Sequence, residues 1–207
     1  MTSSDLRAEL GARTVPDFDM TLPPGWTRKP VDETALDGIL GGLRKRLMEA
    51  HKPQAYAELQ PLVKQSFQAM QRQGAFAFFS ATEPDDSTVW LPASIIASER
   101  RAQAGQNLDD LARTLIREQG ATPLAGDKRT LRFELERPVR LGSQTVISHS
   151  IIYLTAIPGT GRRRALQLVA GFGRAPEDPS DDPFLMKTKY LFDSCVATLR
   201  WRAPRGA

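Results

Sequence analysis

The chain has 207 residues, a formal net charge of +4 and 25% charged residues, which are ordinary values for a globular protein and exclude wholesale disorder. Its one cysteine, Cys195, rules out an intramolecular disulfide and any multi-cysteine metal site. No segment approaches the roughly 20 apolar residues of a membrane span, and the N-terminal residues lack a signal-peptide pattern. These features predict a cytoplasmic protein with no membrane span.

The first part of the chain is predicted to contain two short strands. Residues 1–15 are small and polar and are expected to be frayed or disordered. Residues 18–22 alternate between apolar and polar, which is typical of a half-buried strand, and the turn Pro23-Pro24-Gly25 ends it. A second short strand is expected to start at Trp26.

Two amphipathic helices are predicted next. Asp32 is a typical N-cap, and apolar residues recur at helical spacing from Leu36 to Leu47. A second apolar stripe runs from Tyr56 to Met70. Pro61 lies within it and indicates either a kink or the true start of that helix.

The period then changes to that of strands. Residues 75–81 and 88–98 are predicted as strands, with a turn at 83–87 between them. A helix follows, capped by Asn107 and ended by Gly120.

Three consecutive strands are predicted at about residues 128–138, 144–156 and 163–173, joined by turns at 142–143 and 158–161. Asp182 and Pro183 then mark the start of a final helix. The basic end of the chain from Trp201 is expected to be loose.

This order of elements predicts an α+β fold, with a mostly antiparallel sheet flanked by helices. We expect a single domain over residues 16–203, with a loose tail at 204–207.

Catalytic motifs are absent from the sequence, which has neither a G-x-S-x-G nucleophile motif nor a P-loop. His149 would act as a general base only with an orienting partner, for which Glu134 and Glu136 are the candidates; otherwise it is a half-exposed strand histidine. Cys195 falls near the end of a predicted helix and is interpreted as a buried thiol. We therefore predict that the protein is not an enzyme and needs no cofactor or metal.

The candidate binding residues are basic or aromatic. Residues 159–164 form a glycine turn with three arginines, which suits an anion; the alternative is a solvated hairpin tip. The three tryptophans are interpreted as core or groove-lining residues. The candidates are therefore Trp26, Trp90, Arg162, Arg163, Arg164 and Trp201. Nucleic acid is disfavoured as a partner, because no basic stripe is interleaved with aromatic residues.

Two segments resemble the PsbP-like superfamily, which includes PsbP and the LpqN-type proteins. The segment Phe18–Trp26 is similar to the opening strand and P-x-G-W turn of that superfamily, and Phe192–Trp201 is similar to its closing helix. The resemblance implies an α/β/α sandwich and a role in binding or assembly without shared catalytic residues. Some small members serve as chaperones in bacterial secretion.

These observations lead to one principal hypothesis and one alternative. The principal hypothesis is a non-enzymatic cytoplasmic adaptor for a protein partner, with an accessory or chaperone-like role in bacterial secretion or assembly as its specialised form. Its contact surface would be the groove between sheet and helices or the exposed side of the helices between Asp32 and Gln73. The alternative is a small-ligand-binding domain, with Phe78, Trp90 and Phe172 lining an apolar pocket.

Overall fold

The computed structural model describes residues 16–82, 86–102, 107–141, 144–179 and 181–202. Within these ranges, no helix has the length and apolar character needed to cross a membrane. The tails predicted at 1–15 and 204–207, the hairpin turn at 142–143 and most of the turn at 83–87 lie outside the described residues.

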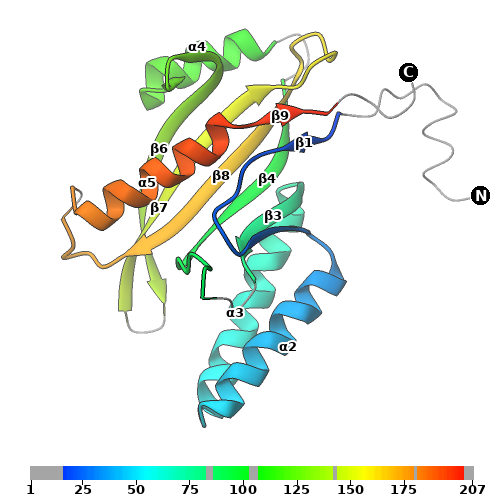
Figure 1. Ribbon diagram of the computed structural model, residues 1–207. Coiled ribbons are helices and arrows are strands. Elements are labelled where there is room, and N and C mark those ends of the chain that lie inside the picture. Colours follow the sequence, from blue (N-terminus) through cyan, green and yellow to red (C-terminus); the bar gives the residue numbers. More distant parts are fainter. Residues whose placement is uncertain (1–15, 83–85, 103–106, 142–143, 180, 203–207) are drawn as a thin grey trace, which may run out of the picture.

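An antiparallel sheet of seven strands forms the centre of the fold (Figure 1). In spatial order its strands are β2 (Trp26–Pro30), β3 (Ala75–Ala81), β4 (Ala93–Arg101), β8 (Arg164–Arg174), β7 (Gln144–Ala156), β6 (Asp127–Leu141) and β5 (Thr122–Leu124). A separate two-stranded ribbon pairs β1 (Phe18–Asp19) with β9 (Arg200–Trp201). The predicted α+β class with a mostly antiparallel sheet is confirmed.

Helices cover both faces of the sheet. Side chains alternate between the faces of a strand, so the neighbours Ile151 and Ile152 of β7 point to opposite sides. Ile151 belongs to the main core together with Phe192 of α5 (Pro183–Ala197). On the other face, Leu108 of α4 (Leu108–Gln119) packs with Leu154 of β7. The layers are therefore α5, sheet and α4 (Figure 1).

The helix α5 is the best-anchored helix of the fold. The Asp182 side chain accepts hydrogen bonds from the backbone N–H groups of Phe184 and Leu185, at 2.9 and 3.1 Å, which confirms the predicted N-cap. Its buried residues are Leu185, Thr188, Phe192, Cys195 and Val196. Burial also raises the pKa of the Cys195 thiol, so the prediction of a buried thiol is confirmed.

The helices α2 (Glu33–Glu49) and α3 (Pro53–Arg72) form a hairpin that projects beyond the sheet (Figure 1). Asp32 caps α2 by accepting from the Ala35 N–H at 2.9 Å. Pro61 lies inside α3, so it does not mark the start of that helix. In this hairpin only Leu40 and Phe67 are buried, and Phe67 contacts Phe78 of β3 with ring centroids 5.9 Å apart.

Two of the predicted strands were wrong in length. The strand expected over 18–22 is only Phe18–Asp19, and the one expected over 88–98 begins at Ala93. Between Thr88 and Pro92 the backbone forms hydrogen bonds with the Pro24–Trp26 segment. The Val89 N–H donates to the Pro24 carbonyl at 3.0 Å, and the Trp26 indole donates to the Val89 carbonyl at 2.8 Å. This segment therefore holds the Gly25 turn instead of pairing as a strand.

Two short strands were not predicted. β5 has three residues and β9 has two, which is too short for a periodic pattern. Because Trp201 pairs with Phe18 in the ribbon, the expectation that the chain is loose from Trp201 onward was wrong at that residue.

Candidate binding site

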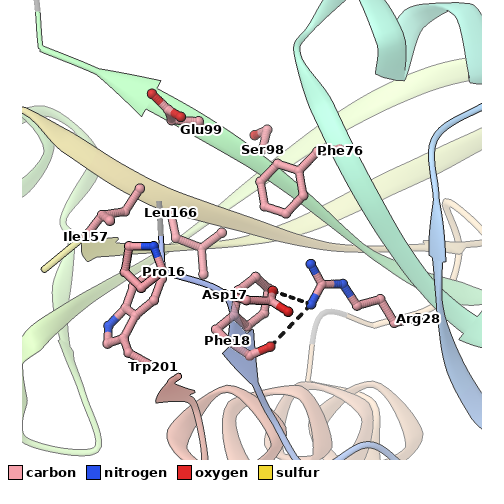
Figure 2. Close-up of a pocket in the computed structure, with 10 residues that line it drawn as sticks. All are labelled: Pro16, Asp17, Phe18, Arg28, Phe76, Ser98, Glu99, Ile157, Leu166 and Trp201. Atoms are coloured by element: carbon pink, nitrogen blue, oxygen red, sulfur yellow. Dashed lines mark hydrogen bonds and ion pairs between the residues drawn. The ribbon is translucent and has the colours of Figure 1, made fainter. Parts of the chain in front are cut away.

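A cavity of about 470 Å³ lies between the β1–β9 ribbon and the adjoining end of the sheet (Figure 2). Its lining combines six apolar residues with four polar or charged ones. The lining residues are Pro16, Asp17, Phe18, Arg28, Phe76, Ser98, Glu99, Ile157, Leu166 and Trp201. We call this the ribbon cavity.

The ribbon forms one wall of the ribbon cavity. Phe18 pairs with Trp201 across the two strands, and their rings meet edge to face with centroids 6.0 Å apart. The backbone N–H of Arg202 donates to the Asp17 carbonyl at 2.7 Å, and its guanidinium is paired with the Asp19 carboxylate. Backbone pairing, ring contact and ion pairing thus hold this wall in place.

Arg28 of β2 is fixed at the mouth of the cavity. Its Nη1 donates to the Asp17 carboxylate at 2.8 Å and to the Phe18 carbonyl at 3.2 Å, and its guanidinium lies 4.9 Å from the Phe18 ring centroid (Figure 2). Burial raises the pKa of Asp17, but the hydrogen bond and charge of Arg28 outweigh it and leave that pKa below its ordinary value. Asp17 is therefore ionised, and its negative charge is balanced by the positive charge of Arg28.

The second carboxylate of the lining, Glu99, is also compensated. Arg164 binds it in a fork, with Nε donating at 2.7 Å, and Arg101 donates from the other side at 2.7 Å. These contacts, that of Arg164 above all, lower the pKa of Glu99. Ser98 beside it is 6% exposed.

Trp201 also lines a second cavity, of about 610 Å³, between the turn after β5 and the C-terminal end of α5. Arg162 stands at its rim, where it forms an ion pair with Asp109 at 2.7 Å. Inside the cavity, the hydroxyls of Thr130 and Thr155 are hydrogen-bonded to each other at 2.7 Å. The sequence-predicted Arg162 and Trp201 therefore both line this second cavity.

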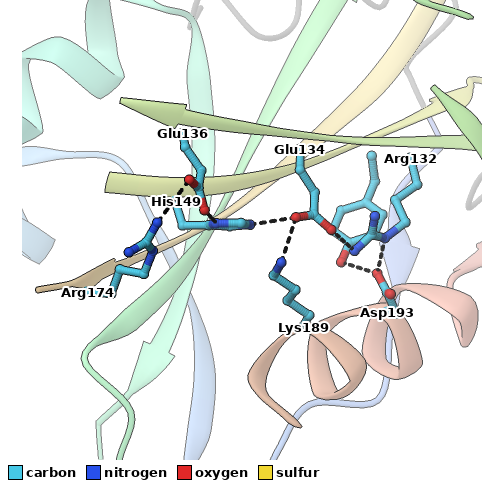
Figure 3. Close-up of polar contacts among 8 residues, drawn as sticks. Arg132, Glu134, Glu136, His149, Arg174, Lys189 and Asp193 are labelled. Atoms are coloured by element: carbon cyan, nitrogen blue, oxygen red, sulfur yellow. Dashed lines mark hydrogen bonds and ion pairs between the residues drawn. The ribbon is translucent and has the colours of Figure 1, made fainter. Parts of the chain in front are cut away.

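His149 lies between two carboxylates beneath the α5 layer (Figure 3). The strand register puts it opposite Glu136, whose Oε1 is 2.8 Å from Nδ1. Its Nε2 is 2.9 Å from Glu134 Oε2, an ion-pair distance without the angle of a hydrogen bond. The imidazole is 1% exposed and stacks on Phe172, with centroids 4.8 Å apart.

The network around His149 connects three strands to α5 (Figure 3). Lys189 of α5 contacts Glu134 at 2.9 Å, and Arg132 of β6 bridges Glu134 and Asp193 at 2.6 and 2.8 Å. The Tyr153 hydroxyl donates to Asp193 at 2.7 Å. Burial of Tyr153 and this hydrogen bond raise the pKa of its phenol, which therefore stays protonated.

This network joins α5 to the sheet and has a structural role. Glu134 and Glu136 supply the carboxylate partner that a general base needs, as the sequence analysis required. However, His149 is enclosed by Phe172 and both carboxylates, and it lines neither of the cavities described above. No group of three or more metal-ligating side chains is found among the described residues.

The remaining sequence-predicted binding residues are spread over the molecule. Trp26 is buried in the core against Phe192. Trp90 is 49% exposed, with the guanidinium of Arg46 above its ring at 5.4 Å. Arg163 is exposed, and its carbonyl accepts from the Ala102 N–H at 2.9 Å.

The pocket expected at Phe78, Trp90 and Phe172 does not form. Phe78 packs on Phe67 of α3, whereas Phe172 stacks on His149 on the other face of the sheet. Strand alternation separates these two rings, so they cannot share a pocket.

Sequence reasoning missed most of the ribbon cavity. Asp17 and Arg28 are separated by a turn, and Phe76 and Glu99 come from strands that carry no motif. Strict alternation over residues 75–81 would place Phe76 on the same face as Phe78. The register of β3 shifts between Ala75 and Ala77, and Phe76 contacts Phe18 instead, so the alternation could not predict its place in the cavity.

Comparisons with known proteins give little further guidance. No protein family and no curated protein matches the chain. A solved structure from Bacteroides thetaiotaomicron VPI-5482 is similar over 91% of this chain, with 14% sequence identity and a TM-score of 0.40. The chain spans 46% of the length of that structure.

Proposed function

We propose that the protein is a non-enzymatic, cytoplasmic adaptor that binds a partner protein through the α2–α3 hairpin. The observation that carries the proposal is the low burial of this hairpin. Its two helices comprise 17 and 20 residues, yet bury only Leu40 and Phe67. Helices whose stability depends on tertiary packing normally bury a full apolar stripe.

The apolar surface left over lies mainly on α3. Leu59 and Leu62 are 39% and 41% exposed, and their spacing of three residues puts them on one side of the helix. Adjacent exposed leucines are typical of a surface that receives an amphipathic helix. We call Leu59 and Leu62 the hairpin patch.

The charge of the hairpin indicates the chemistry of the partner. Around its distal end the basic residues are Arg44, Lys45, Arg46, Lys52 and Lys64, and the acidic ones are Glu49 and Glu58. No ion pair joins any of these basic side chains to another described residue. An acidic amphipathic helix would complement both the leucines and the unpaired positive charge.

The resemblance of the two chain ends to the PsbP-like superfamily supports a binding or assembly role by analogy. The accessory role in bacterial secretion that the resemblance implies would be a special case of this proposal.

The test compares partner capture by three forms of the tagged full chain from lysate of the native cell. The hairpin variant carries Leu59→Asp and Leu62→Asp. The matched control carries Met186→Asp and Tyr190→Asp, which replace exposed apolar residues of α5 that are 52% and 75% exposed. Circular dichroism establishes that all three forms are folded.

We expect a stoichiometric acidic partner to be retained by the wild type and the α5 control and lost from the hairpin variant. Its capture should weaken in high salt, because screening reduces the attraction of exposed charges. Equal retention by the hairpin variant, or the absence of any stoichiometric protein, would contradict the proposal.

A further inference from the structure

We propose that the ribbon cavity binds a neutral aromatic small molecule. The volume of about 470 Å³ falls within the roughly 300–1,000 Å³ that is typical of small-ligand pockets. This inference is independent of the adaptor proposal, because the cavity and the hairpin patch share no residue.

The shape of the lining favours a flat apolar ligand. Phe18, Ile157 and Leu166 are 3%, 4% and 2% exposed and give the cavity a buried apolar floor. Phe76 and the half-buried Trp201 stand at its sides, and Phe76 is 44% exposed (Figure 2). An aromatic ring placed between them would cover exposed ring surface and gain stacking or edge contacts.

The electrostatics of the lining favour a neutral ligand. Arg28 is paired with Asp17, and Glu99 is paired with both Arg164 and Arg101, so each charged side chain of the lining already has an oppositely charged partner. An anionic ligand would lie close to two ionised carboxylates, and a cationic one would meet carboxylates that already have partners. A buried charge without a partner is costly, so both kinds of ion are disfavoured.

Ser98 also borders the cavity. It pairs with Gln167, whereas its neighbour Glu99 pairs with Leu166 of the cavity floor, so the Ser98 side chain points to the opposite face of the sheet. The ligand class is therefore an apolar aromatic compound that binds through contacts with the rings of Phe76 and Trp201.

The first experiment titrates the full chain with N-phenyl-1-naphthylamine, a neutral aromatic amine whose fluorescence rises in apolar surroundings. Its anionic counterpart, 8-anilino-1-naphthalenesulfonate, has the same ring skeleton with an added sulfonate and tests the charge preference. We expect saturable binding of the neutral probe at one site, with at least tenfold weaker binding of the anionic one. No saturable binding of the neutral probe, or a preference for the anion, overturns the proposal.

The second experiment locates the probe with matched variants. Phe76→Ala removes an exposed ring of the cavity. Phe184→Ala removes a ring on α5 that is 61% exposed and does not line the cavity. We expect Phe76→Ala to weaken neutral-probe binding about tenfold and Phe184→Ala to leave it unchanged.

Thermal unfolding of each variant shows that the fold is intact. If Phe76→Ala and Phe184→Ala weaken binding equally, or if neither changes it, the probe is bound elsewhere and the ribbon cavity is not the site.

Discussion

The α5 layer and the α2–α3 hairpin differ in how much of their surface is buried against the sheet. The 15 residues of α5 bury five side chains and join β6 and β7 through the network of Lys189 and Asp193. The hairpin has more than twice as many residues and buries two. The comparison teaches that helical length and apolar spacing do not by themselves show which helix holds the fold together.

Truncating one side chain in each region tests this difference most strongly. Phe192 is 0% exposed and contacts the rings of Trp26 and Phe172, so Phe192→Ala should lower the free energy of unfolding by about 3–5 kcal/mol. Leu62→Ala on the hairpin should cost less than about 0.5 kcal/mol, as for an ordinary surface site. Urea unfolding followed by circular dichroism measures both values. Similar losses in the two variants would break the comparison.

Acid should weaken the contacts of the α5 layer more than those of the hairpin. Burial raises the pKa of Glu134, but Lys189 and Arg132 outweigh it and leave the pKa below its ordinary 4.5. Its ionised form therefore stabilises the fold above about pH 4.5, and this contribution disappears as the pH falls through the lowered folded-state pKa.

The variant Glu134→Gln should lose about 1.5 kcal/mol at pH 7, the lower end for a hydrogen bond to a charged group, and should flatten the stability profile between pH 5 and pH 3. Glu58→Gln on the hairpin is the control, because its carboxylate forms no ion pair with a described residue. Urea midpoints measured across this pH range give both profiles. Parallel profiles for wild type and Glu134→Gln would show that the network contributes nothing to the acid response.

The smallest expected effect is a gain in stability. A Cβ added at Gly38, Gly41 or Gly42 of α2 would meet no atom within 4 Å, so each change to alanine should stabilise the protein by about 0.5–1 kcal/mol. Gly25→Ala is the contrasting change, since Gly25 has φ +75° and an added Cβ would come within 2.7 Å of the Thr88 side chain. The midpoint temperature of thermal unfolding should therefore rise for the three α2 variants and fall for Gly25→Ala.

The sequence predicted the regular elements of the fold well where a period or a cap was present. Asn107 and Gly120 were found as the ends of α4, and the structure shows the full capping box and the left-handed C-cap. Long strands such as β7 were found from their apolar alternation. Caps and alternation are visible in the sequence itself, so these elements can be recognised without knowledge of their tertiary contacts.

The candidate site was predicted much less well, because it depends on pairings between distant residues. Glu134 and Glu136 were named as candidate partners of His149 and both lie beside it, but only the register of β6 and β7 shows which carboxylate faces which ring nitrogen. Trp201 was a candidate from its residue type alone, but its partner Phe18 was taken as part of a longer strand. Strands of two residues carry no periodic signal that would join them.

The β1–β9 ribbon has a consequence for how the protein is made. Asp19 and Arg202 are 183 residues apart in sequence, so the two halves of the ribbon leave the ribosome at different times. At the usual synthesis rate of about 5–20 residues per second, Phe18 waits on the order of 10–40 seconds for Trp201. The ribbon cavity is therefore completed after the strands that form its floor, and ligand binding there would report that synthesis has passed this point.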